Sequence, residues 1–190
     1  MLESKNFENV SILMHGHEVI ISRSDQLDTT GFEVFFPNEI ASNIYDSLIL
    51  SGDPNRIKLI GEKAFELARV QAKIPKWGNE ITKDYNPLEA NLLEMISWTK
   101  GCYIGQEVVA RLHNYEKVKQ HLVGFSVPMV GNISPGDRII SNDRNVGTIT
   151  SAVSIPGSEK TIAMGYIRAN FVNTPTDLCL SSGLRIDIND

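Results

Sequence analysis

The sequence predicts an α+β fold in which a ferredoxin-like mixed unit is followed by a small all-β barrel. Short β-branched segments alternate with two amphipathic helical patterns up to residue 75, whereas short strand patterns and turns, without a helical pattern, recur from residue 119 onward. The chain has 190 residues, 42% of them hydrophobic and 22% charged, as in packed globular proteins. We expect a mixed unit over residues 1–95, a linking segment over residues 96–118 and a barrel over residues 119–190.

The mixed unit is predicted from four strand patterns and two helical patterns. Residues 10–14 and 18–22 flank a turn and form a hairpin, residues 32–36 form a third strand, and residues 57–60 are a fourth strand candidate. Apolar residues recur every four positions at Ile40, Ile44 and Leu48, which predicts a helix after Pro37. A second amphipathic helix is predicted over residues 61–73, closed off by Pro75.

The barrel is predicted from regularly punctuated strand patterns. Strand candidates occupy residues 120–127, 138–141, 146–151, 161–167 and 184–188, and turn residues lie at 135–137, 142–143 and 156–157. Several short strands with tight turns and no helix are typical of a small barrel or sandwich.

Composition disfavours several classes of partner and site. The formal net charge of -5 offers no basic surface for nucleic acid, and no apolar run reaches the ~20 residues that span a bilayer. The start of the chain lacks a secretion signal, so we expect a cytoplasmic location, or a mitochondrial one in a eukaryote. Two distant cysteines indicate free thiols, and the pairs His15/His17 and His113/His121 lack the further ligands of a zinc site.

Residues 100–107, K-G-C-Y-I-G-Q-E, contain the candidate reactive residue, Cys102. Ile104, Val108 and Leu112 are spaced as one buried stripe and predict a helix over residues 104–113, with Cys102 just ahead of its first turn. The helix dipole and Lys100 would favour a thiolate there. The alternative is that Cys102 packs as a small buried apolar residue and that Tyr103 belongs to the core or an interface. We expect Cys179 to lie in the core.

These residues resemble the K-G-C-Y-x-G-Q-E signature of the YgfZ family, folate-binding relatives of the glycine-cleavage T-protein (aminomethyltransferase). Residues 30–33 (T-G-F-E), 67–75 (L-A-R-V-Q-A-K-I-P) and 86–90 (N-P-L-E-A) also resemble T-protein segments, so the resemblance spans nearly the whole chain. It implies two α+β units and a C-terminal barrel arranged as a ring around tetrahydrofolate. The first α+β unit, which bears a catalytic aspartate in the T-protein, is expected to be absent here.

The resemblance implies site residues and partners. It makes Cys102 the functional thiol and Glu33 a candidate partner of the folate pterin, with Lys100 and Tyr103 as further candidate folate-binding residues. For Glu33, a solvated position between inward-facing Phe32 and Val34 is an equal alternative. The implied partners are folate and iron–sulfur client proteins, and a second chain that completes the ring is also expected.

Three functions follow from the resemblance. The first is a tetrahydrofolate-binding protein that supports assembly or repair of iron–sulfur enzymes through Cys102. The second is an aminomethyltransferase, whose proton transfers need an acid such as Asp25, Asp28, Glu33 or Asp84. The third is one half of a split folate-binding protein.

Overall fold

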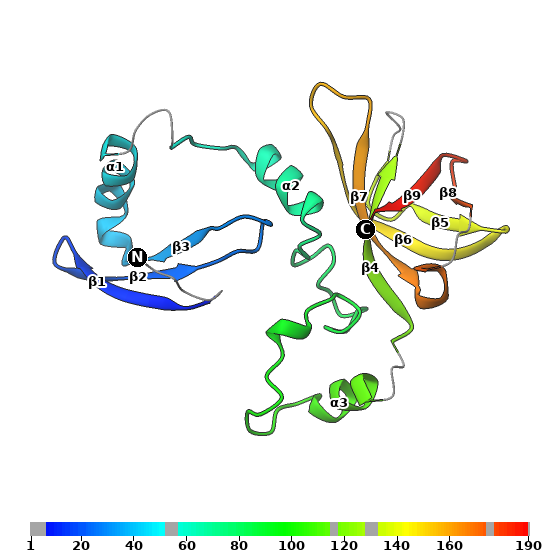
Figure 1. Ribbon diagram of the computed structural model, residues 1–190, viewed down its shortest axis with the longest axis horizontal. Coiled ribbons are helices and arrows are strands. Elements are labelled where there is room, and N and C mark those ends of the chain that lie inside the picture. The colour runs from blue at the N-terminus through cyan, green and yellow to red at the C-terminus, as the bar shows by residue number, and fades with distance from the viewer. Residues whose placement is uncertain (1–6, 52–56, 115–117, 128–132, 174–176, 190) are drawn as a thin grey trace. The chain divides into compact units, whose positions relative to one another are not determined.

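The computed structural model describes the chain except for residues 1–6, 52–56, 115–117, 128–132, 174–176 and 190, and it divides into two compact units (Figure 1). The first unit is Met1–Phe65 and the second is Glu66–Asp190. Helix α2, Glu62–Gln71, crosses this boundary. The expected order of a mixed α/β part followed by a barrel is confirmed.

The first unit is a three-stranded antiparallel sheet with a helix packed on one face. Its strands β1 (Asn9–Met14), β2 (His17–Arg23) and β3 (Phe32–Phe35) lie in the order β1-β2-β3. His15 and Gly16 both have positive φ, 50° and 78°, as a two-residue hairpin turn requires. The short helix η1 (Asn38–Ile40) and α1 (Ala41–Ser51) pack against this sheet through Ile40 and Ile44, which contact Val19.

One predicted element of this unit is wrong. Residues 57–60 form no strand and their side chains are exposed. An apolar run becomes a strand only where a neighbouring strand accepts its backbone hydrogen bonds. No described strand pairs with these residues.

The second unit is built around a closed antiparallel barrel with the strand order β4-β7-β6-β5-β8-β9. Its strands are β4 (Gln120–Val127), β5 (Arg138–Ser141), β6 (Arg144–Ser154), β7 (Thr161–Arg168), β8 (Leu178–Leu180) and β9 (Arg185–Asn189). The short helix η3 (Ala169–Phe171) follows β7. Alternate residues of β4 and β7, including Phe125, Ala163 and Ile167, fill the interior.

The outer face of β7 is also buried, which explains its nearly continuous apolar sequence. Met164 and Tyr166 point to the opposite side from Ala163 and form a second core with Val70 and Ala90. The end of α2 and residues 72–92 therefore cover this side of the barrel. Residues 93–114, with η2 (Leu93–Met95) and α3 (Gln106–Asn114), then lead toward β4.

Candidate functional site

The signature residues form a loop that leads into α3. The Cys102 side chain is exposed, and Tyr103, Ile104 and Gly105 lie between it and the helix. Gly105 has φ +91°, and its carbonyl accepts the backbone N–H of Val109 at 3.1 Å. The second glycine of the signature thus supplies the left-handed backbone from which the helix starts.

Two aromatic contacts order this loop. The Lys100 ammonium lies 4.4 Å from the centroid of the Tyr103 ring, a cation–π contact that spans Cys102. Trp98 stacks on His113 with ring centroids 4.5 Å apart, which joins the start of the loop to the last turn of α3. The loop is therefore held at both ends while the thiol between them remains open to solvent.

The expected buried stripe of this helix is wrong. Helix α3 begins at Gln106, two residues later than expected, and Ile104 and Val108 are 104% and 54% exposed. Leu112 alone of the three is half-buried. The spacing identified one apolar face correctly, but spacing does not determine whether another element covers that face.

A buried polar network, which the sequence analysis missed, fixes residues 66–80 to the barrel. Arg69 and Glu80 are 3% and 0% exposed, and Arg69 Nη1 lies 3.1 Å from Glu80 Oε2. Ser151 of β6 donates a hydrogen bond to Glu80 Oε1 at 2.6 Å and accepts one from Arg69 Nη2 at 2.8 Å. The sequence signal was Arg69 itself, a charged residue within the apolar face of a helix.

Neighbouring charges extend the network to the surface. Glu66 accepts hydrogen bonds from Arg69 at 2.9 Å and from Lys76 at 2.8 Å. Burial raises the pKa of the Glu66 carboxyl, but the hydrogen bonds from Arg69 and Lys76 outweigh burial and the pKa is lowered from its usual value. The fold therefore favours the ionised form of Glu66.

Two tyrosines meet beside this network. Tyr85 stacks on Tyr166 with ring centroids 3.6 Å apart, and the Tyr166 hydroxyl donates a hydrogen bond to the Glu80 carbonyl at 2.9 Å. Burial raises the pKa of both phenols, and the charges of Asp84 and Glu89 on Tyr85, and of Glu80 and Glu89 on Tyr166, raise it further. Both rings are held in their neutral form.

Glu33 lies on β3 of the first unit and is exposed. The Ser24 hydroxyl donates a hydrogen bond to Glu33 Oε1 at 3.4 Å. Phe35 lies two residues farther along the same face, opposite Ile20 of β2, and these side chains are 54% and 37% exposed. Phe32, expected to face inward, is 53% exposed.

The predicted site residues thus fall into two groups. Lys100, Cys102 and Tyr103 share one loop of the second unit, whereas Glu33 belongs to the first unit. Among the candidate acids, Asp25 forms an ion pair with Arg23 at 2.8 Å, and Asp28 and Asp84 are exposed. No cluster of three or more metal-ligating side chains occurs in the part of the chain that the structure describes. No helix within those described residues is long and apolar enough to cross a membrane.

Comparison with known families assigns both parts of the chain. Residues 3–100 match the model of the GCVT N-terminal domain. Residues 120–184 match the glycine cleavage T-protein C-terminal barrel domain, which corresponds to the observed barrel.

Individual relatives agree with this assignment. The chain is 29% identical to an aminomethyltransferase of Alkaliphilus oremlandii over 90% of its own length and 47% of that protein. It is 30% identical to an aminomethyltransferase of Caldanaerobacter subterraneus over 82% of its length and 41% of that protein. A putative chloroplastic transferase of Arabidopsis thaliana is 30% identical over 85% of this chain and 37% of its own. The chain therefore spans less than half of the length of each of these relatives.

A solved structure shows the same fold. The crystal structure of the glycine cleavage system aminomethyltransferase T from Bartonella henselae superimposes with a TM-score of 0.81 at 22% identity. The match covers 99% of this chain and 52% of that chain.

Proposed function

This chain belongs to the glycine cleavage T-protein family, and from that premise we propose that it binds tetrahydrofolate and takes part in one-carbon transfer of the aminomethyltransferase type. The observation that carries the proposal is the consecutive match of the GCVT N-terminal domain and the T-protein C-terminal barrel to the two parts of one chain. The aminomethyltransferase names of the relatives support it.

Glu33 is the residue that we propose to hold the pterin. An ionised carboxylate accepts two hydrogen bonds side by side, as the amino and ring N–H groups of a pterin offer them. The open sheet face around Glu33 supports this proposal, because Phe35 and Ile20 supply exposed apolar surface for a flat ring. Bound tetrahydrofolate would supply the acceptor for the one-carbon unit.

An acid near the one-carbon unit must guide proton transfer in such a reaction. Asp25 forms an ion pair with Arg23, whereas Asp28 and Asp84 are exposed. We therefore propose Asp28, in the loop that leads to β3, as the acid for a folate bound at Glu33.

A calorimetric titration tests folate binding. We expect tetrahydrofolate, or its methylene or formyl form, to bind the wild-type chain, and Glu33→Gln to weaken that binding at least tenfold. Glu18→Gln is the matched control, because Glu18 is an exposed carboxylate on the neighbouring strand β2. Absence of binding by all three forms, or equal binding by Glu33→Gln, would refute the proposal. Turnover of an aminomethylated carrier protein by the wild-type chain would establish the transferase.

The exposed Cys102 favours a second function, support of iron–sulfur enzymes as in the YgfZ family. Its loop is ordered on both sides by the Lys100–Tyr103 and Trp98–His113 contacts, while the thiol itself is open to solvent. This arrangement suits a thiol that forms transient bonds with a client protein. In this proposal the chain consists of a folate-binding unit over residues 1–95, a linking segment over residues 96–118 that contains the thiol, and the barrel over residues 119–190. Lys100 and Tyr103 would then contact folate only when their mutual contact opens.

The two thiols of the chain provide the test. Cys179 is half-buried, and its Sγ lies 3.7 Å from the Ile140 carbonyl oxygen, so Cys179→Ser is the control for Cys102→Ser. In cells where this gene is the sole source of the activity, Cys102→Ser should lower the activity of iron–sulfur enzymes and Cys179→Ser should not. Full activity with Cys102→Ser would exclude this second function and leave the transferase proposal intact.

A second chain that completes the ring is the third proposal. The chain spans less than half of the length of each of the three relatives. Sedimentation of the purified chain alone should show self-association if a second copy takes that place. A monomer that binds tetrahydrofolate tightly would exclude the need for a complement.

A further inference from the structure

Strand β1 is an edge of the three-stranded sheet, and its outer side is unpaired. In the order β1-β2-β3, β2 occupies one side of β1, and no strand among the described residues pairs with the other side. An antiparallel strand points its backbone N–H and C=O groups alternately to its two sides. The outer side of β1 therefore presents a row of hydrogen-bonding groups to which a further strand can add.

This edge lacks the features that usually protect an edge strand. Charged side chains, proline or a bulge commonly prevent the pairing of edges between chains. The sequence of β1, N-V-S-I-L-M, has no charged residue and no proline, and its six residues pair with β2 without a shift in register. The other edge strand, β3, has only four residues, contains Glu33 and ends shortly before Pro37.

The core of the first unit is left open at β1. Ile12 lies opposite Val19 and therefore on the same face of the sheet, the face that packs against α1. Val19 is 0% exposed, whereas Ile12 is 37% exposed. A strand added beyond β1 would cover Ile12 if its own apolar side chains lay on that face.

A second copy of β1 meets this requirement. Two copies can run antiparallel about a two-fold axis at Ile12, so that each Ile12 lies opposite the other and Val10 of each copy lies opposite Met14 of the other. These three residues share the face that packs against α1. Because β1 is uncharged, no like charges meet in this pairing, whereas two copies of β3 would bring two Glu33 carboxylates together.

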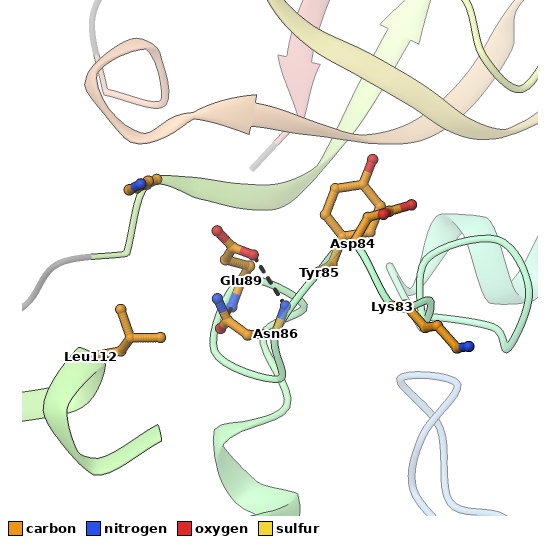
Figure 2. A pocket seen from close by; sticks show the side chains of 7 residues that line it. Lys83, Asp84, Tyr85, Asn86, Glu89 and Leu112 are labelled. Carbon is orange, nitrogen blue, oxygen red and sulfur yellow. Dashed lines mark hydrogen bonds between the residues drawn. The ribbon is translucent and has the colours of Figure 1, made fainter. Parts of the chain in front are cut away.

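The second unit offers no comparable edge within the described residues. Its barrel is closed, so each strand has a neighbour on both sides. It has a hollow of about 360 Å³ beside residues 86–90 (Figure 2). There Glu89 Oε2 accepts the backbone N–H of Asn86 at 3.1 Å, and Lys83 and Lys119 are exposed to solvent. The lining is mainly charged and polar, which does not suit an apolar strand.

We propose that two copies of this chain pair antiparallel through their β1 edges, which joins their sheets into one continuous sheet. The pairing leaves the open face with Ile20, Glu33 and Phe35 accessible, because these residues lie on β2 and β3. It requires neither folate nor Cys102, and the second copy need not complete the ring. Six residues a side are far fewer than the ~20–30 of a standard interface, so the dimer is reversible and its population rises with concentration.

Sedimentation of the full chain over a concentration series tests this pairing. The wild type should change from monomer to dimer as its concentration rises. Ser11 is exposed and lies opposite Ile20, so a charge there does not enter the core. Ser11→Lys and Ser11→Glu each place like charges diagonally across the axis and should each weaken dimerisation at least tenfold. An equimolar mixture of the two variants should dimerise again, because opposite charges then face each other.

Ser42→Lys and Ser42→Glu are the matched controls, because Ser42 is an exposed serine on α1 of the same unit. They should dimerise as the wild type does. Tetrahydrofolate binding should be equal in the Ser11 variants and the wild type, so a failure of the folate proposal would leave this one intact.

Three results would overturn the proposal: a wild type that stays monomeric at every concentration, Ser11 variants that dimerise as the wild type does, or a mixture that does not recover dimerisation. Should a Ser11 variant fail to fold by circular dichroism, Leu13→Lys and Leu13→Glu repeat the test at a side chain that is 78% exposed.

Discussion

Glu80 is a fully buried carboxylate whose oxygens are all engaged. Its partners are the Arg69 guanidinium, the Ser151 hydroxyl and the backbone N–H of Lys76. Removing one member of a buried ion pair costs about 3–5 kcal/mol, and without Glu80 the buried Arg69 guanidinium would keep only its ion pair with Glu66. We therefore expect Glu80→Ala to lower the free energy of unfolding by about that amount in urea denaturation.

Glu94→Ala is the control for this variant, because Glu94 is exposed. It should change the free energy of unfolding by less than about 0.5 kcal/mol, as is usual for surface substitutions. An equal loss of unfolding free energy in Glu80→Ala and Glu94→Ala would contradict a stabilising role of the buried network around Glu80.

Tyr166 gives a pH-dependent prediction. Burial and neighbouring negative charges raise the pKa of its phenol in the folded protein, whereas in the unfolded chain it is about 10. The unfolded state then loses this proton first, so stability is full below pH ~10 and falls as the pH rises above that value. The melting temperature of the wild type should fall more steeply above this pH than that of Tyr166→Phe. Tyr45→Phe, at an exposed position, should behave as the wild type.

At the scale of single residues, the sequence could predict positions of interest but not their partners. The signature identified Cys102 as a position of interest, and its side chain is exposed in the structure. Glu80 was not singled out, because its partners Arg69 and Ser151 lie 11 and 71 residues away in the sequence. Such pairings are set by how residues 72–92 pack against β6 and β7, which no local pattern records.

At the scale of elements, we predict that the close approach of β6 to Gly165 of β7 excludes a larger side chain. A Cβ added at Gly165 would lie 2.4 Å from the Thr148 carbonyl oxygen, a backbone atom that cannot move aside without disturbing β6. Overpacking of this kind costs about 1–3 kcal/mol. Gly165→Ala should therefore lower the melting temperature clearly. Gly101→Ala should not, since nothing lies within 4 Å of its added Cβ; a similar loss in both variants would contradict the packing of β6 on β7.

Five of the six barrel strands were predictable because each contains β-branched residues and turn residues punctuate them, and the barrel pairs all five. Strand β8 (Leu178–Leu180) has no β-branched residue and was not among the strand candidates. Residues 57–60 have the same local character as those five but pair with no strand in the described part of the chain, so the strand prediction failed there. Helix α3 failed differently: its apolar face exists, but Ile104 and Val108 remain exposed. Local pattern thus predicts the kind of element, whereas burial depends on the neighbours that the rest of the fold supplies.

At the scale of the whole molecule, the division into two compact units predicts that unfolding is not a single transition. The core of the first unit is centred on Val19, Ile40 and Ile44, while the barrel interior is larger and closed on itself. A closed barrel leaves no unpaired edge strand, so we expect the first unit to open at lower free energy.

Matched truncations in the two cores test this directly. Ile44→Ala and Ile139→Ala each remove a buried side chain, 3% and 0% exposed, and each should cost about 2–5 kcal/mol in its own unit. In hydrogen-exchange mass spectrometry, Ile44→Ala should speed exchange in β1–β3 and α1 but leave the barrel strands unchanged. Ile139→Ala should weaken protection throughout the barrel, because its strands form one closed hydrogen-bonded ring. Faster exchange in both units from either variant would mean that the chain unfolds as one cooperative body.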